Sequence, residues 1–202
     1  MTRIESAKNK TSLRDVAAIA FFLLLVLLVW ALVKNMASTK ELRIHGEAGI
    51  CDLRNADFDE AIYVVDGDAW DIWAERLYAP ADFADGITGE PTPPSEIDYA
   101  KIQYATHRTT LLLQPGITYG ISTRSSDYSM RLFIGGEQFD LVGVPGTTKE
   151  ETVPRTLERA YYFTAREEHT EIVIQAANFV HWVGAYIFDI SVGSYRNISQ
   201  QR

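Results

Sequence analysis

The sequence predicts an all-β protein, a jelly-roll β-sandwich preceded by one N-terminal transmembrane helix. The helix is predicted by Val16–Val33, eighteen residues with no charge, proline or glycine. The sandwich is predicted by about eight short β-rich runs that follow, separated by clusters of Gly, Pro, Ser and Asp. Short strands at such spacing are typical of antiparallel sandwiches and jelly rolls.

The apolar run Val16–Val33 has the length of a membrane span. A helix of this length rises roughly 27 Å at about 1.5 Å per residue, close to the hydrocarbon thickness of a bilayer. Trp30 lies near its far end, where indole rings prefer the headgroup layer. The alternative is a cleaved signal peptide, whose apolar core usually runs about 7–15 residues before a small-x-small site. Because this run is longer and the exit KNMASTK is a poor cleavage site, we expect an uncleaved anchor.

The charges on the two sides of this run are opposite. Residues 1–40 hold six Lys or Arg against two acidic residues, a net charge of +4, and the remainder holds thirteen against twenty-five, a net charge of −12. The positive-inside rule therefore predicts a single-pass protein of the cell membrane with a cytoplasmic N-terminus and an extracytoplasmic C-terminal domain. We expect no nucleic-acid partner, because that partner requires a basic surface.

These observations divide the chain into five segments. We expect a cytoplasmic tail (1–15), the transmembrane helix (16–33), a linker (34–48), the extracytoplasmic sandwich (49–195) and a C-terminal tail (196–202). The sandwich is long enough to bury a core of its own.

The expected strands end at recognisable turn signals. They are Ala61–Val65, Thr109–Leu113, Ile117–Thr123, Ser129–Ile134, Glu137–Val144, Tyr161–Thr164, Glu171–Ala176 and Ala185–Val192. Trp70–Leu77 fits either a strand or one short helix. Gly135-Gly136 predicts a two-residue hairpin turn. Four isoleucines of the last strands are expected in the core: Ile172, Ile174, Ile187 and Ile190.

Neither a catalytic constellation nor a disulfide is predicted. The four histidines share no metal-ligand spacing, and the single cysteine, Cys51, is expected to be a buried thiol, with an intermolecular disulfide as the alternative. Asp66, Asp68 and Asp71 could offer oxygen ligands to a calcium ion, or they could form only a solvated turn. A structural calcium is thus the one cofactor that the sequence leaves open.

The best candidates for ligand binding lie in the loop from Asn178 to Gly184. An amide, an imidazole and an indole fall within five residues there, at Asn178, His181 and Trp182, and Tyr186 follows closely. Sugar recognition uses such a mixture of a flat apolar face and fixed polar groups. The alternatives are that Asn178 only braces a turn and that Trp182 only caps the core. Trp70 and Trp73 are interpreted as core residues.

Four phrases in order along the chain resemble a known family. They are GDAWDIWAERLYAPADF (67–83), YATHRTTLLL (104–113), SMRLFIGGEQF (129–139) and EIVIQAANFVHWVGAYIFDISVGS (171–194). Together they resemble the galactose-binding-like extracytoplasmic domain at the N-terminus of bacterial membrane sensor histidine kinases and diguanylate cyclases, including seven-transmembrane signalling receptors. The resemblance implies a jelly roll outside the membrane and signalling domains elsewhere in the parent protein.

Composition and resemblance together favour a non-enzymatic ligand-sensing domain that binds a small molecule or glycan. The alternative is a free-standing, membrane-tethered carbohydrate-binding or adhesion module without signalling output. The membrane is the expected partner through Val16–Val33, and a homodimer is a further possibility.

Overall fold

The computed structural model describes residues 13–36, 39–66, 69–124, 128–155, 158–180, 184–185 and 190–200. The chain divides into two compact units, Met1–Thr39 and Lys40–Arg202, and each is described by itself.

The first unit contains one helix, α1 (Leu13–Met36). Its segment Arg14–Ala31 is long and apolar enough to cross a membrane, a property that anchors share with signal sequences. Large apolar side chains such as Phe21 and Leu24 are 68% and 66% exposed. Side chains of this kind require an apolar surrounding, which a bilayer supplies.

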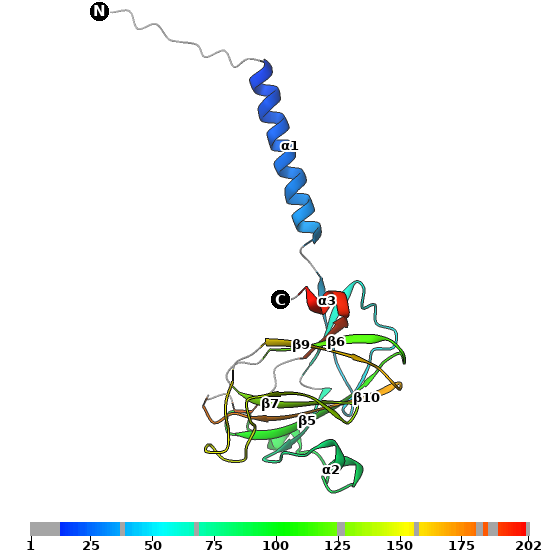
Figure 1. Cartoon of the computed structure of the whole chain (residues 1–202), viewed down its shortest axis with the longest axis vertical. Coiled ribbons are helices and arrows are strands. Elements are labelled where there is room, and N and C mark those ends of the chain that lie inside the picture. Colours follow the sequence, from blue (N-terminus) through cyan, green and yellow to red (C-terminus); the bar gives the residue numbers. More distant parts are fainter. Residues whose placement is uncertain are drawn as a thin grey trace, which may run out of the picture. The chain divides into compact units, whose positions relative to one another are not determined.

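The second unit is a β-sandwich of two mixed sheets (Figure 1). We call the five-stranded sheet "sheet A"; its order is β1-β3-β11-β6-β9. Its strands are β1 (Lys40–Ile44), β3 (Ala61–Val65), β6 (Thr118–Arg124), β9 (Glu158–Thr164) and β11 (Ile190–Ser194). β1 and β3 are parallel, and the other neighbours are antiparallel.

Sheet B has the order β2-β5-β10-β7-β8, and β4 also pairs with β5. Its strands are β2 (Ile50–Asp52), β4 (Asp71–Ala74), β5 (Tyr104–Leu112), β7 (Ser129–Ile134), β8 (Glu137–Val142) and β10 (His169–Ala177). β2 runs parallel to β5, and the other pairs are antiparallel. The segment between β4 and β5 carries α2 (Pro80–Ala84) and the 3₁₀ turn η2 (Pro94–Glu96). α2 lies on the side of sheet B that faces away from sheet A (Figure 1).

The core fills the space between the two sheets. Strand alternation sends every second side chain inward, and the expected core residues Ile172, Ile174 and Ile190 are fully buried there. Ile187 lies outside the described residues. Cys51 is also fully buried, as expected, and burial raises the pKa of its thiol despite the opposing contact with Thr109.

The hairpin prediction and the core position of Trp70 are confirmed, whereas Trp73 is buried outside the core. Trp70 and Trp73 are 7% and 5% exposed, Trp70 in the core and Trp73 on the opposite face of sheet B. Gly135 and Gly136 join β7 to β8 with φ angles of 56° and 82°, the left-handed values that such two-residue turns require.

Three features differ from the expectations. The sheets are mixed, because β1 and β2 are parallel to their neighbours. β1 lies within the segment expected to be a linker, 34–48, and α3 (Tyr195–Ser199) begins within the expected sandwich and extends into the expected C-terminal tail, 196–202. Both unexpected elements are short and weakly patterned. β1 is stabilised by its pairing with β3, and α3 is stabilised by the burial of its own residue Ile198. Neither element depends on a strong local propensity.

Candidate functional site

Asn178, the one candidate binding residue of this loop that the structure describes, has its side-chain amide engaged within the loop. It is buried, its Nδ2 donates to the carbonyl of Gly184 at 2.8 Å, and its Oδ1 accepts from the backbone N–H of Val180 at 3.1 Å. The amide therefore braces the loop, as the alternative interpretation held. His181, Trp182 and Tyr186 lie outside the described residues, so ligand binding by this loop stays a prediction.

The structure describes two of the three predicted calcium ligands, Asp66 and Asp71. Asp66 follows β3 in sheet A and pairs with Arg43, at 3.4 Å. Asp71 lies in β4 of sheet B, half-buried, and burial raises the pKa of its carboxyl group although Arg108 opposes this. Asp68 lies outside the described residues. Within the described part of the chain, no group of three His, Cys, Asp or Glu side chains could hold a metal ion.

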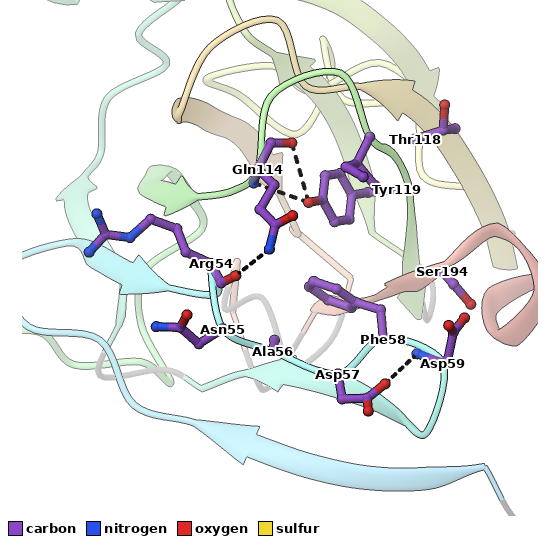
Figure 2. Close-up of a pocket in the computed structure, with 11 residues that line it drawn as sticks. Arg54, Asn55, Ala56, Asp57, Phe58, Asp59, Gln114, Thr118, Tyr119 and Ser194 are labelled. Carbon is purple, nitrogen blue, oxygen red and sulfur yellow. Dashed lines mark hydrogen bonds between the residues drawn. The ribbon is translucent and has the colours of Figure 1, made fainter.

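A hollow of about 450 Å³ is the clearest candidate site (Figure 2). It lies between the segment that follows β2, the loop that enters β6, and the end of β11. Figure 2 shows the Phe58 and Tyr119 rings near its centre, with Arg54 and Asn55 on one side and Asp59 and Ser194 on the other. The lining residues are Arg54, Asn55, Ala56, Asp57, Phe58, Asp59, Gln114, Ile117, Thr118, Tyr119 and Ser194.

The segment Arg54–Asp59 forms one wall and is fixed by side chains from distant elements. Gln114 Nε2 donates to the carbonyl of Arg54 at 2.7 Å. Asn197 Nδ2, from α3, donates to the carbonyls of Phe58 at 2.7 Å and Asp59 at 3.2 Å. These bonds satisfy backbone groups that no strand partner reaches, so the wall is held in one shape.

The aromatic side chains build an apolar floor. Phe58 makes edge contacts with Tyr63 and Tyr119, with ring centroids 5.2 and 5.1 Å apart. The Tyr119 hydroxyl accepts from the backbone N–H of Gln114 at 3.1 Å, which fixes the ring. Burial raises the pKa of Tyr119, against the opposing bond from Gln114, so its hydroxyl stays protonated at neutral pH.

The polar side chains around this floor divide into two groups. Asp57 Oδ1 accepts from the backbone N–H groups of Asp59 at 3.0 Å and Glu60 at 3.2 Å, so it shapes the turn. The exposed side chains of Asn55 and Asp59, by contrast, form no hydrogen bond or ion pair with the described residues. The side chains of Asn55 and Asp59 are therefore available to a ligand.

Arg54 directs its charge away from the hollow's floor. It pairs with Asp52 at 2.6 Å and with Glu168 at 2.8 Å, and its hydrogen bond lowers the pKa of Asp52 to about 2. Among the described lining residues, the carboxylates of Asp57 and Asp59 both lack an ion pair, and that of Asp59 also lacks a hydrogen bond. A hollow with a fixed aromatic floor, an amide and a carboxylate can hold a small ligand that has C–H faces and hydrogen-bonding groups.

The sequence carried a signal for this site that the prediction did not use. Arg54–Asp59 reads RNADFD, a dense set of Asn and Asp around one aromatic residue in a short connection between strands. Asx residues in that pattern indicate a turn shaped by its own side chains, and loops of that kind often carry binding groups.

Comparisons with known proteins show no family for this chain. No protein-family model matches the sequence, and no curated protein is similar to it. Among solved structures, the β-sandwich is similar to part of the GH2 beta-galacturonidase from Eisenbergiella tayi, with 8% identity, a TM-score of 0.41, and coverage of 66% of this chain and 24% of that chain.

Two further solved structures have comparable similarity. The insecticidal delta-endotoxin Cry8Ea1 from Bacillus thuringiensis has 14% identity and a TM-score of 0.36, over 69% of this chain and 25% of that chain. The beta-glucosidase from Kluyveromyces marxianus has 13% identity and a TM-score of 0.38, over 79% of this chain and 21% of that chain. The chain thus spans about a quarter of these proteins, and similarity at this level carries no argument about its function.

Proposed function

We propose that this chain is a membrane-anchored, non-enzymatic binding domain that takes up a small carbohydrate in the hollow beside Phe58. The observation that carries the proposal is the joint presence of a fixed aromatic floor and two unoccupied polar side chains, Asn55 and Asp59. Aromatic faces pack on the C–H surface of a sugar ring, and a carboxylate and an amide bind its hydroxyl groups. A volume of about 450 Å³ is within the usual size range of small-molecule sites.

Binding, rather than catalysis, is favoured by the hydrogen bonds at the hollow. Asp57 is engaged in its own turn, and the Tyr119 hydroxyl is engaged with Gln114. Glycosyl transfer needs a pair of available carboxylates, and of the two that line the hollow, Asp57 is held in its turn by two backbone hydrogen bonds, which leaves Asp59.

The test is a titration of the full chain in a polyoxyethylene detergent, because glucoside and maltoside detergents would themselves present sugars. Calorimetry with a panel of mono- and disaccharides identifies a ligand, and Asp59→Asn should weaken its binding at least about fivefold, the loss of one charge-assisted hydrogen bond. Asp85→Asn, an exposed acid next to α2, is the charge-matched control and should bind as the wild type does. Equal binding by the wild type and Asp59→Asn would contradict this assignment of the hollow.

We further propose that the domain is the sensing part of a signal-transduction receptor, with residues 1–15 in the cytoplasm. The support is the family resemblance and the excess of Lys and Arg before Val16–Val33. The test is energy transfer between fluorophores at the N-termini of two copies in liposomes. A sensor that works through a homodimer changes this transfer when its sugar is added, whereas a tethered adhesion module leaves it unchanged.

A further inference from the structure

Arg131 lies on the outer face of sheet B, turned away from the core. Its neighbours along β7, Met130 and Leu132, are fully buried between the two sheets, so strand alternation places Arg131 on the opposite face. Across the sheet its partners are Gln175 on β10 and Leu141 on β8. The guanidinium group therefore stands between two uncharged side chains.

The hydrogen bonding of this guanidinium group is incomplete. Nη1 donates to Gln175 Oε1 at 3.0 Å, and Gln175 is itself 3% exposed. Nε is sealed from solvent and has no hydrogen-bond partner among the described residues. Nη2 also forms no hydrogen bond with the part of the chain that the structure describes, but it is not sealed from solvent and so reaches the surface.

Arg131 also differs from the other strand arginines whose side chains the structure describes. Each of those meets a carboxylate: Arg43 meets Asp66 at 3.4 Å, Arg108 meets Glu171 at 2.7 Å, and Arg159 meets Asp140 at 2.9 Å. Arg131 forms no ion pair with a described residue, although acids outnumber bases by nearly two to one after residue 40. The acids that the structure describes thus do not supply its counter-charge.

A half-buried charge without a counter-ion is unfavourable, and a buried donor without an acceptor adds to the penalty. The unpartnered atoms form one edge of the guanidinium group, Nε and Nη2. That edge binds a carboxylate through two parallel N–H···O bonds, the arrangement that makes such pairs strong. A carboxylate from outside the chain would satisfy both the charge and the orphaned donor.

We propose that Arg131 anchors a second ligand site, which binds the carboxylate group of a small organic acid. The carboxylate enters from the surface at Nη2, and its second bond to Nε forms once the side chains that seal Nε move aside. Leu141 is 38% exposed and offers an apolar contact to the carbon body of the acid. One positive charge with uncharged neighbours selects a monocarboxylate over a dianion. This site is on sheet B and does not depend on the proposed sugar site beside sheet A.

The test observes Arg131 directly in the unmodified protein. In the full chain in polyoxyethylene micelles, arginine Nε–Hε resonances are recorded by NMR, and Arg131→Lys identifies the Arg131 signal. Acetate added at constant ionic strength should move that signal downfield and saturate, while chloride leaves it unmoved. Arg166, an exposed arginine paired with Glu137 at 2.9 Å, is the control and should not respond.

Larger acids then define the ligand class. D-glucuronate should move the Arg131 signal and D-glucose should not, because the two sugars differ in the carboxylate. Arg131→Gln should weaken glucuronate binding at least about tenfold while the amide spectrum stays that of the folded protein. An Arg131 signal that no carboxylate moves, or that phosphate moves and acetate does not, would overturn the proposal.

Discussion

His107 is a titratable side chain placed where only its neutral form fits. It is 2% exposed, lies in edge contact with Trp70, and has an Nδ1 atom without a hydrogen-bond partner. Burial lowers the pKa of His107 to about 3, although a hydrogen bond with the backbone of Ile174 opposes the shift. A protonated ring would place a second N–H where no acceptor lies.

The sign of the pH effect follows from this lowered pKa. The unfolded chain takes up the proton near pH 6.5 and the folded chain does not, so stability is complete above that pH and falls as the pH drops toward 3. Between pH 6 and 4, the free energy of unfolding should fall more steeply in the wild type than in His107→Leu. We expect the difference between the two slopes to be up to about 1.4 kcal/mol per pH unit. Urea titrations followed by tryptophan fluorescence measure both slopes.

The control for this prediction is His169→Gln, because His169 is exposed. That variant should keep the pH dependence of the wild type. If the free energy of unfolding changes with pH equally in His107→Leu and in the wild type, the fold does not hold the His107 imidazole neutral.

The sequence predicts which single residues are buried wherever strand alternation decides burial. It does not predict the role of a side chain that depends on hydrogen-bond partners far away in the chain. Ile172 and Ile174 could be assigned to the core from their spacing alone. Asn178 could not be assigned, because its role is set by the carbonyl of Gly184 across the loop. The hollow was missed for the same reason, since its wall is held by Asn197 from the far end of the chain.

At the scale of elements, Asp140 ties the two sheets together. It lies in β8 of sheet B and accepts hydrogen bonds from two residues of β9 in sheet A: from the Tyr161 hydroxyl at 2.7 Å and from Arg159 Nη1 at 2.9 Å. Burial acts to raise the pKa of Asp140, but the bonds from Tyr161, the backbone N–H of Leu141 and Arg159 outweigh it and lower the pKa. Tyr161 responds in the opposite direction, its pKa raised by burial and by the carboxylate.

Removing this carboxylate should loosen the sandwich edge. We expect Asp140→Asn to lower the free energy of unfolding by about 1–3 kcal/mol, because Arg159 and Tyr161 lose a charged acceptor. A carboxyl group whose pKa is lower in the folded than in the unfolded chain stabilises the fold at pH values above its pKa in the unfolded chain. This stabilisation is lost as the pH falls through its pKa in the folded chain. The difference between wild type and variant should therefore shrink in acid, below about pH 4.

Glu137→Gln is the matched control for this element-scale prediction. Glu137 is also in β8 and also pairs with an arginine, Arg166, but both side chains are largely exposed, at 59% and 78%. Solvent screens such a pair, so this substitution should change stability by less than about 0.5 kcal/mol. If Asp140→Asn and Glu137→Gln lowered the free energy of unfolding equally, Asp140 would contribute no more to stability than a surface ion pair does.

The strands that the sequence predicted are those with strong local signals. Ala61–Val65 and Ser129–Ile134 match β3 and β7 at both ends, since turn residues bound them. β1 and β2 have five and three residues and little alternation, and they form because β3 and β5 offer free edges. Such strands are determined by tertiary pairing, which a local pattern does not contain.

At the scale of the whole molecule, the distribution of charged residues before and after the apolar run Val16–Val33 predicts which side of the membrane each part occupies. Arg3, Lys8, Lys10 and Arg14 precede the span, and the chain after residue 40 is strongly acidic. Cys51 is fully buried and its thiol pKa is raised, so a membrane-impermeant maleimide should not react with it in the folded protein. New cysteines can therefore report topology without removing the native one.

We expect opposite labelling of two variants in spheroplasts. Glu150→Cys, at an exposed loop position of the sandwich, should react with the maleimide without permeabilisation, because we expect that domain to be outside. Ser6→Cys should react only after permeabilisation, since the positive-inside rule predicts that the basic tail stays in the cytoplasm. Labelling of Ser6→Cys before permeabilisation would reverse the topology. A mature protein that lacks residue 6, seen by mass spectrometry, would instead identify the apolar run as a cleaved signal peptide.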